Sequence, residues 1–152
     1  MPEKTGAVHV ACVRRMAVGA VILNEAGDVL LVRNRGHGRA HWSLPKGSCE
    51  DGESVLHTLK REVKEETGLD VAMQELAFVS EWFVTGRQEW YLQFYFHATI
   101  VGGVLGVQES DEDVIQVKWV APRNIRQYMN YRPWAVPLFA WLDERRPKYH
   151  VF

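Results

Sequence analysis

The sequence predicts a mixed α/β fold, in which one long helix is set among several β-strands. Three observations lead to this class. A helical pattern without glycine or proline covers residues 53–67, alternating strand patterns lie on both sides of it, and helical segments lie near the end of the chain. A chain of 152 residues with 47% hydrophobic residues is large enough to bury a core. We therefore expect residues 1–152 to form a single domain.

The residues before the helix predict strands joined by turns. Residues 9–13 are expected to form a short edge strand, and residues 17–24 form a β-rich stretch that contains Val18, Val21, Ile22 and Leu23. A turn follows at residues 25–28, and residues 29–33 return as a second strand. This order predicts a β-hairpin.

The predicted helix at residues 53–67 has two contrasting faces. Ser54 is a capping-type residue at its start, and Gly68 suits the left-handed residue that ends a helix. One face is apolar and is available for burial, and it consists of Val55, Leu56, Leu59 and Val63.

The other face gathers three carboxylates, because Glu62, Glu65 and Glu66 are spaced i, i+3 and i+4. Like charges at this spacing repel by about 0.2–0.5 kcal/mol per pair. The C-terminal end of a helix also disfavours negative charge. Oxygen ligands gathered on a rigid element are what Mg²⁺ or Mn²⁺ prefers, so the cluster favours a divalent-cation site.

Residues 47–69 resemble the Nudix box, G-x5-E-x7-R-E-U-x-E-E-x-G-U, in which U is an aliphatic residue. Every specified position is filled, by Gly47, Glu53, Arg61, Glu62, Val63, Glu65, Glu66, Gly68 and Leu69. The seven positions of fixed identity would match by chance with odds on the order of 10⁻⁹ at a given start. The chain is therefore similar to the Nudix hydrolases.

This resemblance implies the Nudix α/β/α sandwich with a central mixed β-sheet. It also implies hydrolysis of a nucleoside diphosphate linked to another group, with Mg²⁺ or alternatively Mn²⁺ activating a water molecule. The metal ligands it implies are the carbonyl of Gly47 and the carboxylates of Glu62, Glu65 and Glu66. Glu53 and Arg61 are expected to act as a supporting pair. The first candidates for the general base are Glu65 and Asp113.

Basic residues lie just before the box. Lys46 directly precedes Gly47 after a proline turn, so we expect its cation to meet substrate phosphates. The basic loop at residues 34–41, with Arg33 before it and Arg39 within it, is either a solubilising turn or a second phosphate contact. The Leu-Pro-Lys-Gly sequence at residues 44–47 also resembles the hydrolases of diadenosine polyphosphates.

After the box, residues 72–83 and 88–101 predict two strands around a turn at residues 85–87. In the second strand, an apolar face alternates with a polar-tipped aromatic face, as expected of a strand between a core and a pocket. The candidates for stacking on a nucleobase are Trp82, Phe83, Tyr91 and Tyr95, with core packing as the alternative for each. We interpret His97 as a structural histidine.

The last third of the chain predicts an acidic loop, a strand and helices. For the acidic loop at residues 107–113, the resemblance implies that Asp113 or Glu112, with Glu109 behind them, joins the metal site or acts as the base. The alternative is a solvated turn. A strand at residues 114–120, a short helix at 123–128 and a last helix at 135–144 follow. Residues 145–152 are expected to form a frayed basic tail.

Composition limits the partners. The net charge of −1 gives no electrostatic case for binding nucleic acid or a membrane surface. Cys12 and Cys49 match no disulfide or zinc pattern, and residues 1–15 contain no long apolar run. We expect a cytoplasmic protein that binds a small-molecule nucleotide. The resemblance also leaves a homodimer open.

Several alternatives remain at this stage. The substrate is either the linked nucleoside diphosphate above, a (d)NTP including oxidised ones, or an ADP-ribose-type sugar nucleotide. A Nudix-fold regulatory module without turnover is the non-enzyme alternative. Action on the 5′ end of RNA would need a basic channel, for which the sequence offers only Arg33, Arg35, Arg39 and Lys46.

Overall fold

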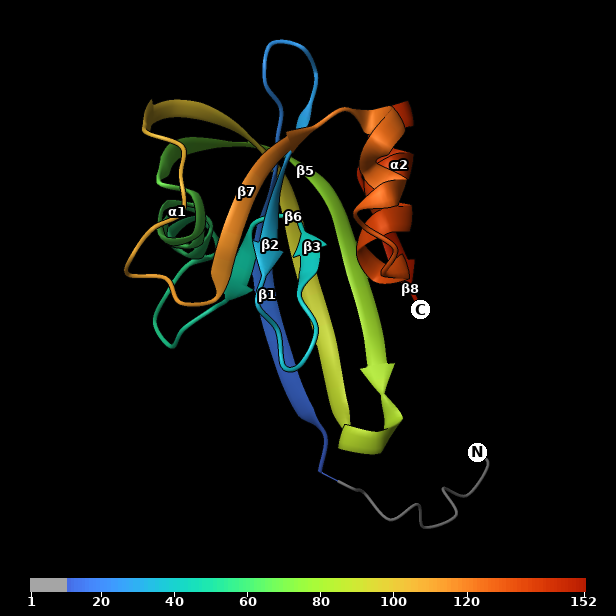
Figure 1. The fold of residues 1–152 in the computed structure, drawn as a ribbon. Helices are drawn as coiled ribbons and strands as arrows, with labels where there is room; N and C mark the ends of the chain where they lie inside the picture. The colour runs from blue at the N-terminus through green and yellow to red at the C-terminus, as the bar shows by residue number, and fades with distance from the viewer. Residues whose placement is uncertain (1–10) are drawn as a thin grey trace, which may run out of the picture.

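The structure, a computed structural model that describes residues 11–152, has three layers (Figure 1). Helices α1 (Val55–Thr67) and α2 (Arg132–Glu144) lie on opposite sides of the central strands. The long strands are β1 (Val13–Ile22), β5 (Leu69–Val84) and β6 (Glu89–Gly103). The shorter elements are β2 (Val29–Asn34), β3 (His41–Ser43), β4 (Lys46–Ser48), β7 (Val114–Val120), β8 (Lys148–Val151), and the 3₁₀ turns η1 (Thr85–Arg87) and η2 (Pro122–Gln127). The expected α/β/α sandwich is confirmed.

The strands form two sheets. The larger sheet has the order β4-β1-β6-β5-β8 and is mixed, because β1 runs parallel to β6 while β5 runs antiparallel to it. The smaller sheet is antiparallel and has the order β3-β2-β7. The central mixed sheet expected from the sequence is therefore present, together with a second, shorter sheet.

The predicted hairpin of residues 17–24 and 29–33 is wrong. The chain does turn between β1 and β2, but a single bridge between Leu23 and Val29 is what joins them. β1 pairs instead with β6, over a register that extends from Val13↔Glu89 to Ile22↔Ala98. The other edge of β1 pairs with β4, from Ala17↔Ser48 to Gly19↔Lys46, so both edges of β1 are occupied and β2 goes to the other sheet.

Side chains on the two faces of β1 pack into two different hydrophobic cores. Val21 packs in the core beneath α2, whereas Val18, Ala20 and Ile22 pack in the core beneath α1. Tyr95 of β6 belongs to the core on the α2 side, where it is fully buried and stacked 4.6 Å from Phe78. Tyr95 is therefore wrong as a nucleobase-stacking candidate, because no face of its ring is open.

The predicted end of α1 is confirmed, and its start shifts by two residues. The hydroxyl of Ser54 accepts a hydrogen bond from the backbone N–H of His57, so Ser54 is the N-cap and Glu53 precedes the helix. Gly68 adopts a left-handed conformation with a φ of 79°. Its N–H donates to the carbonyl of Lys64, which closes the helix.

The ends of the chain also differ from expectation. The edge strand predicted at residues 9–13 lies largely outside the described residues, and β1 itself begins at Val13. The helix expected at residues 135–144 starts earlier, at Arg132. The tail is not frayed, because Lys148–Val151 pairs in parallel with β5 as strand β8. A free strand edge on β5 offered the hydrogen-bond partners that the sequence pattern did not show.

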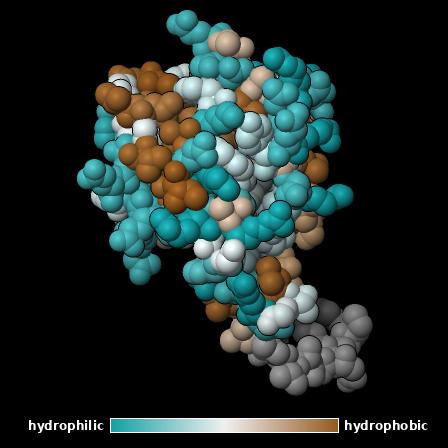
Figure 2. Space-filling model, viewed as in Figure 1, coloured by the Kyte–Doolittle hydropathy of each residue, from teal (hydrophilic) through white to brown (hydrophobic). Residues whose placement is uncertain are grey.

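Several apolar side chains are exposed among residues 11–152, and one group of them is clustered on the surface. Figure 2 shows them gathered at the upper left, over the end of β6 and the loop that follows, where Val101, Val104 and Val107 are exposed. They line neither of the two cavities described below. Within residues 11–152, neither helix has the length and apolar character that crossing a bilayer requires.

Candidate active site

Arg61 lies at the centre of the acidic face of α1. Its guanidinium holds Glu53 in a bidentate pair, with both N···O distances at 2.7 Å. Nη1 of the same group contacts Glu62 at 2.8 Å and Glu65 at 3.2 Å, and Nη2 donates to the carbonyl of Ser48. The hydrogen bonds from Arg61 lower the pKa of Glu53 to about 2. The structure thus forms the Glu53–Arg61 pair that the sequence predicted.

Gly47 is the backbone partner of Glu62. A Cβ atom on Gly47 would lie 1.9 Å from the carboxyl carbon of Glu62. The carboxylate therefore rests directly on the backbone of strand β4, and a side chain at this position would push it away. Burial raises the pKa of Glu62.

Glu66 is the most buried carboxylate of the cluster, with 7% of the residue exposed. Its Oε2 accepts a hydrogen bond of 3.3 Å from the backbone N–H of Lys46. Burial, opposed by the charge of Lys46 and assisted by that of Glu62, raises the pKa of Glu66 to about 8. Burial lowers the pKa of Lys46, while the negative charges of Glu66 and Glu62 act in the opposite direction. Lys46 Nζ lies 4.7 Å above the ring of Trp134.

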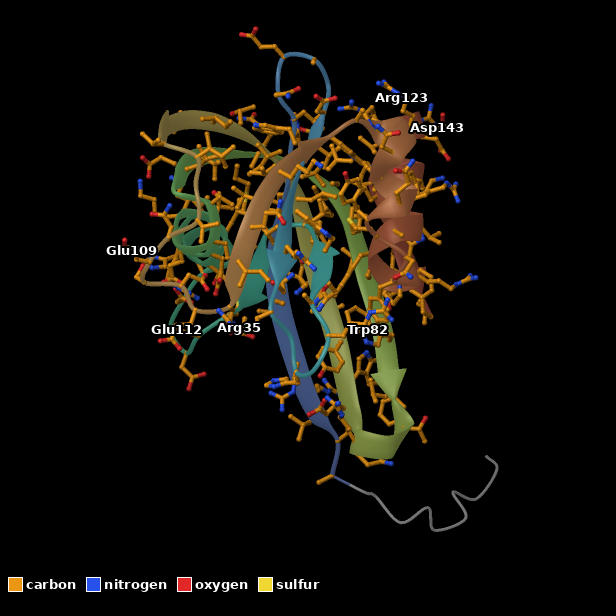
Figure 3. All side chains as sticks on the ribbon, in the orientation of Figure 1. Arg35, Trp82, Glu109, Glu112, Arg123 and Asp143 are labelled. Atoms are coloured by element: carbon orange, nitrogen blue, oxygen red, sulfur yellow. The ribbon has the colours of Figure 1, made fainter. Side chains whose placement is uncertain are left out.

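These groups open into a cleft of about 770 Å³, which we call the acidic cleft. The loop before β7 forms its other wall, with Ser110, Asp111, Glu112 and Asp113. This loop is fixed to the chain after β2, because Arg35 donates to the backbone carbonyls of Glu112 and Asp113. Figure 3 shows Arg35 and Glu112 on this side of the molecule, and Glu109 further out beside α1.

Asp111 is an acidic residue of the cleft that was not among the candidates from the sequence. Its Oδ1 accepts the backbone N–H groups of Asp113 and Val114, which orders the loop. Its negative charge also raises the pKa of both Glu62 and Glu66. Asp113 and Glu112, the residues favoured from sequence, line the cleft as well, whereas Glu109 does not. The sequence showed that this loop carries several acidic residues, but it could not show which of their side chains line the cleft.

A second cavity of about 600 Å³, which we call the aromatic pocket, adjoins the acidic cleft. The predicted Trp82 and Tyr91 line it, stacked on each other with centroids 5.0 Å apart and ring planes 3° from parallel. Figure 3 shows Trp82 on the α2 side of the sheet. Phe83 is wrong as a pocket residue, because it points to the opposite face and is half exposed. Sequence reasoning missed the rest of the wall, which includes His41, Tyr128, Tyr131 and Trp134.

The remaining predicted basic residues are not brought to either cavity. Arg33 lies within β2, opposite Trp42 of β3, and Arg39 lies on the exposed loop between these strands. Neither lines the acidic cleft or the aromatic pocket. From the basic stretch, His37, His41 and Lys46 reach the cleft instead.

The acidic cleft has the chemistry of a hard-cation site, although its ligands are not gathered. Glu62, Glu65, Glu66 and Asp111 all present oxygen atoms, and their mutual charge raises the pKa of Glu62 and Glu66. Within residues 11–152, however, no three acidic, histidine or cysteine side chains converge on one point. Arg61 keeps Glu62 and Glu65 neutralised in this arrangement. The donor set fits Mg²⁺ in kind.

Comparison with known proteins places this fold in a class. The crystal structure of MutT protein from Methanosarcina mazei Go1 superposes with a TM-score of 0.73 at 24% identity, over 90% of this chain and 97% of that chain. The crystal structure of a NUDIX hydrolase from Nitrosomonas europaea also superposes with a TM-score of 0.73, at 22% identity over 99% of this chain and 84% of that chain, so the fold is the Nudix fold. The NUDIX domain family profile matches residues 13–142, so the chain belongs to the Nudix family.

Two relatives show the range of similarity. The chain is 37% identical to human 8-oxo-dGDP phosphatase NUDT18 over 102 residues, which are 66% of this chain and 30% of that protein. It is 28% identical to phosphatase NudJ from Escherichia coli O1:K1 over 113 residues, 74% of this chain and 72% of that protein. The chain thus spans less than a third of the length of the human relative.

Proposed function

We propose that this chain hydrolyses a phosphoanhydride bond in a nucleoside diphosphate linked to another group. The observation that carries the proposal is the acidic cleft, in which the carboxylates of α1 face Gly47 of β4 and Asp111 lies across from them. The names of the human and E. coli relatives, both phosphatases, support it.

The proposed reaction depends on Mg²⁺, with Mn²⁺ as an alternative. The groups that would hold the cation are the Gly47 carbonyl, Glu62, Glu65 and Glu66, with Asp111 as a further oxygen donor. When bound, such a cation offsets the charge of substrate phosphates and lowers the pKa of a coordinated water.

The chain's own residues then have separate roles. Arg61 and Glu53 position the loop and the acidic face, because one guanidinium joins Glu53, Glu62, Glu65 and the Ser48 carbonyl. Lys46, which lines the cleft, supplies positive charge near the phosphates. Glu65, which is half exposed, and Asp113 are the candidates for taking the proton of the attacking water.

Among substrates, we favour nucleoside di- and triphosphates over diadenosine polyphosphates and ADP-ribose-type compounds. The observation in favour is the human relative, whose name gives 8-oxo-dGDP as its substrate. Recognition of an RNA 5′ end is disfavoured, because Arg33 and Arg39 lie outside both cavities. A regulatory module without turnover is the competing class.

The test is a panel of nucleoside di- and triphosphates, diadenosine polyphosphates and ADP-ribose, assayed with Mg²⁺ and with a chelator. We expect turnover that requires Mg²⁺ and a loss of at least about a hundredfold in kcat, roughly 2.7 kcal/mol, in Glu65→Gln or Glu66→Gln. Glu109→Gln is the matched control, because Glu109 lies outside the cleft. Nucleotide binding without turnover would establish the regulatory module, and full activity of both cleft variants would reject the assigned site.

A further inference from the structure

The face of the larger sheet that packs against α1 extends beyond that helix. Figure 1 shows β1, β5 and β6 continuing past α1, toward the turn that joins β5 to β6. Val18 is the first residue of β1 that packs in the core beneath α1, and it is fully buried. Met16, its neighbour on the same face of the strand, is 40% exposed. Helix α1 therefore covers only one end of this face.

The strand registers place the side chains of the uncovered end next to one another. Trp90 of β6 is paired with Arg14 of β1 and with Phe83 of β5. Leu92, two residues further along β6, is paired with Met16 of β1 and with Glu81 of β5. We call this surface the open face, and it consists of Arg14, Met16, Glu81, Phe83, Trp90 and Leu92.

The open face offers both a recess and an apolar ring beside it. The recess is a hollow of about 250 Å³, and its lining includes Met16, Trp90 and Leu92. Phe83 lies next to Trp90 without lining the hollow, and 44% of the residue is exposed. Exposed apolar side chains gathered in one place mark interaction surfaces. A surface with a ring and a recess side by side can pack against a copy of itself.

The open face also carries one positive and one negative group, on either side of its apolar centre. The guanidinium of Arg14 lies 5.7 Å from the ring centroid of Trp90. The carboxylate of Glu81 accepts a hydrogen bond of 2.6 Å from the hydroxyl of Tyr149. Within residues 11–152, neither Arg14 nor Glu81 forms an ion pair. Strand β6 lies between them, so they are too far apart along the sheet to pair with each other.

We infer that the open face is the interface of a homodimer, in which two copies pack face to face about a two-fold axis that runs along β6. Such an axis sets β1 of one copy opposite β5 of the other. Arg14 of each copy then lies beside Glu81 of the other, and Phe83 of each copy faces the hollow of the other. Two apolar sheet faces stacked about 10 Å apart are the arrangement found in β-sandwiches.

The charges favour a second copy over a partner with a single sign of charge. The two-fold axis exchanges Arg14 and Glu81, so both groups gain a partner in the same interface. An acidic or a basic partner would leave one of them covered and unpaired, which is costly. Arg15, which also lines the hollow, is already paired with Glu89 at 2.9 Å and needs no partner from outside.

The inference is independent of the proposed function, because no residue of the open face lines the acidic cleft or the aromatic pocket. Loss of hydrolysis would therefore leave the dimer untouched, and a monomeric chain would leave the proposed function untouched.

The test is sedimentation velocity of the whole chain over a dilution series. We expect the wild type to be mainly dimeric at about 100 µM and to dissociate on dilution. Phe83→Glu places a charge against the apolar hollow of the other copy, so it should weaken dimerisation at least about tenfold. A wild type that stays monomeric at the highest concentration overturns the inference.

A charge exchange tests the two-fold axis itself and does not depend on the apolar centre. Arg14→Glu and Glu81→Arg each set like charges against each other across the interface, so each should weaken dimerisation about tenfold. The double variant restores opposite charges and should recover most of that loss. A double variant that dimerises no better than the two single variants overturns the proposed pairing, because changes confined to one copy would not compensate each other.

The matched control is Val104→Glu, which adds the same charge to a different exposed apolar residue, one that is 82% exposed. Its dimerisation should equal that of the wild type. A loss in Val104→Glu as large as that in Phe83→Glu would place the interface elsewhere and overturn the inference. Circular dichroism and thermal melts of every variant identify any loss of dimer that comes from unfolding.

Discussion

At the scale of the residue, Arg61 is where the charges of the acidic cleft converge. Its five donors reach two carboxylates of the box that flank the cleft, the bidentate partner Glu53 and a backbone carbonyl. A lysine, with a single charged head, lacks the planar fork that holds these groups at once. The position therefore needs arginine, as the sequence pattern indicated.

The first residue-scale prediction concerns Gly47→Ala. The new Cβ would overlap the Glu62 carboxylate, which is the mobile end of a side chain, so the carboxylate moves at little cost in stability. We expect kcat to fall at least about tenfold with a change in the free energy of unfolding of under about 1 kcal/mol. Steady-state assays and denaturant melts measure both. Gly86→Ala, with open space around its Cβ, is the control, and an equal loss there would contradict the argument.

The second concerns pH. Burial raises the pKa of Glu66 to about 8 in the folded protein, above its usual value of 4.5. The folded state thus holds a proton that the unfolded state has released, so this contribution to stability is complete below about pH 4.5 and is lost as pH rises to about 8. Without Mg²⁺, we expect the free energy of unfolding to fall across this window, by at most about 1.4 kcal/mol per pH unit.

Chemical denaturation at intervals from pH 5 to pH 8.5, with a chelator present, checks this expectation. Glu66→Gln cannot titrate and should show a flatter profile over the same window. Parallel profiles for the variant and the wild type would mean that Glu66 ionises normally in the folded protein.

At the scale of the element, α1 holds the site because both of its ends are fixed. Ser54 caps the start, and Gly68 closes the end next to β5. Between them, Leu59 and Val63 pack against β1 and β5 and orient the opposite face toward Gly47. Ordering of the acidic face therefore depends on apolar packing on the other side of the helix.

The element-scale prediction is that Ser54→Ala destabilises the protein. Loss of the bond from the His57 N–H leaves a helix donor without its side-chain partner. We expect a cost of about 1 kcal/mol, measured as a shift of the urea midpoint at constant slope. Ser54→Thr, which can still cap, should lie within about 0.5 kcal/mol of the wild type; an equal loss in both variants would assign the effect to packing.

At the scale of the whole molecule, the two cavities join elements from all parts of the chain. The acidic cleft combines α1 and β4 with the loop before β7, and the aromatic pocket combines β3, β5 and β6 with the start of α2. A ligand in the cleft would thus bind only the folded chain. Any such ligand stabilises the fold by mass action.

The whole-molecule prediction is a metal-dependent melting temperature. With Mg²⁺ at about ten times its dissociation constant, we expect about 1.4 kcal/mol of stabilisation, a rise of about 3–6 °C for a chain of this size. Differential scanning fluorimetry at pH 8 with Mg²⁺ or a chelator gives the shift. Glu62→Gln combined with Glu65→Gln should abolish it, and persistence of the full shift in that double variant would place the ion elsewhere.

The sequence by itself determined the parts of this protein that depend on local spacing. The i, i+3, i+4 carboxylates and the cap residues belong to one contiguous stretch, so helical geometry alone places them on α1. The strands at residues 72–83, 88–101 and 114–120 were also predictable, because alternation is a local signal.

Only the tertiary structure decided which segments meet. β1 pairs with β6 on one edge and with β4 on the other, so β2 joins the second sheet. Asp111, His41 and Trp134 reach the cavities through loops and through α2, whose positions depend on packing between distant segments. Burial is likewise a property of the assembled layers. It makes Glu66 less accessible to solvent than Glu65, and it leaves Tyr95 in the core, outside the aromatic pocket. No local spacing encodes it, because it is set by which side chains come to surround each group.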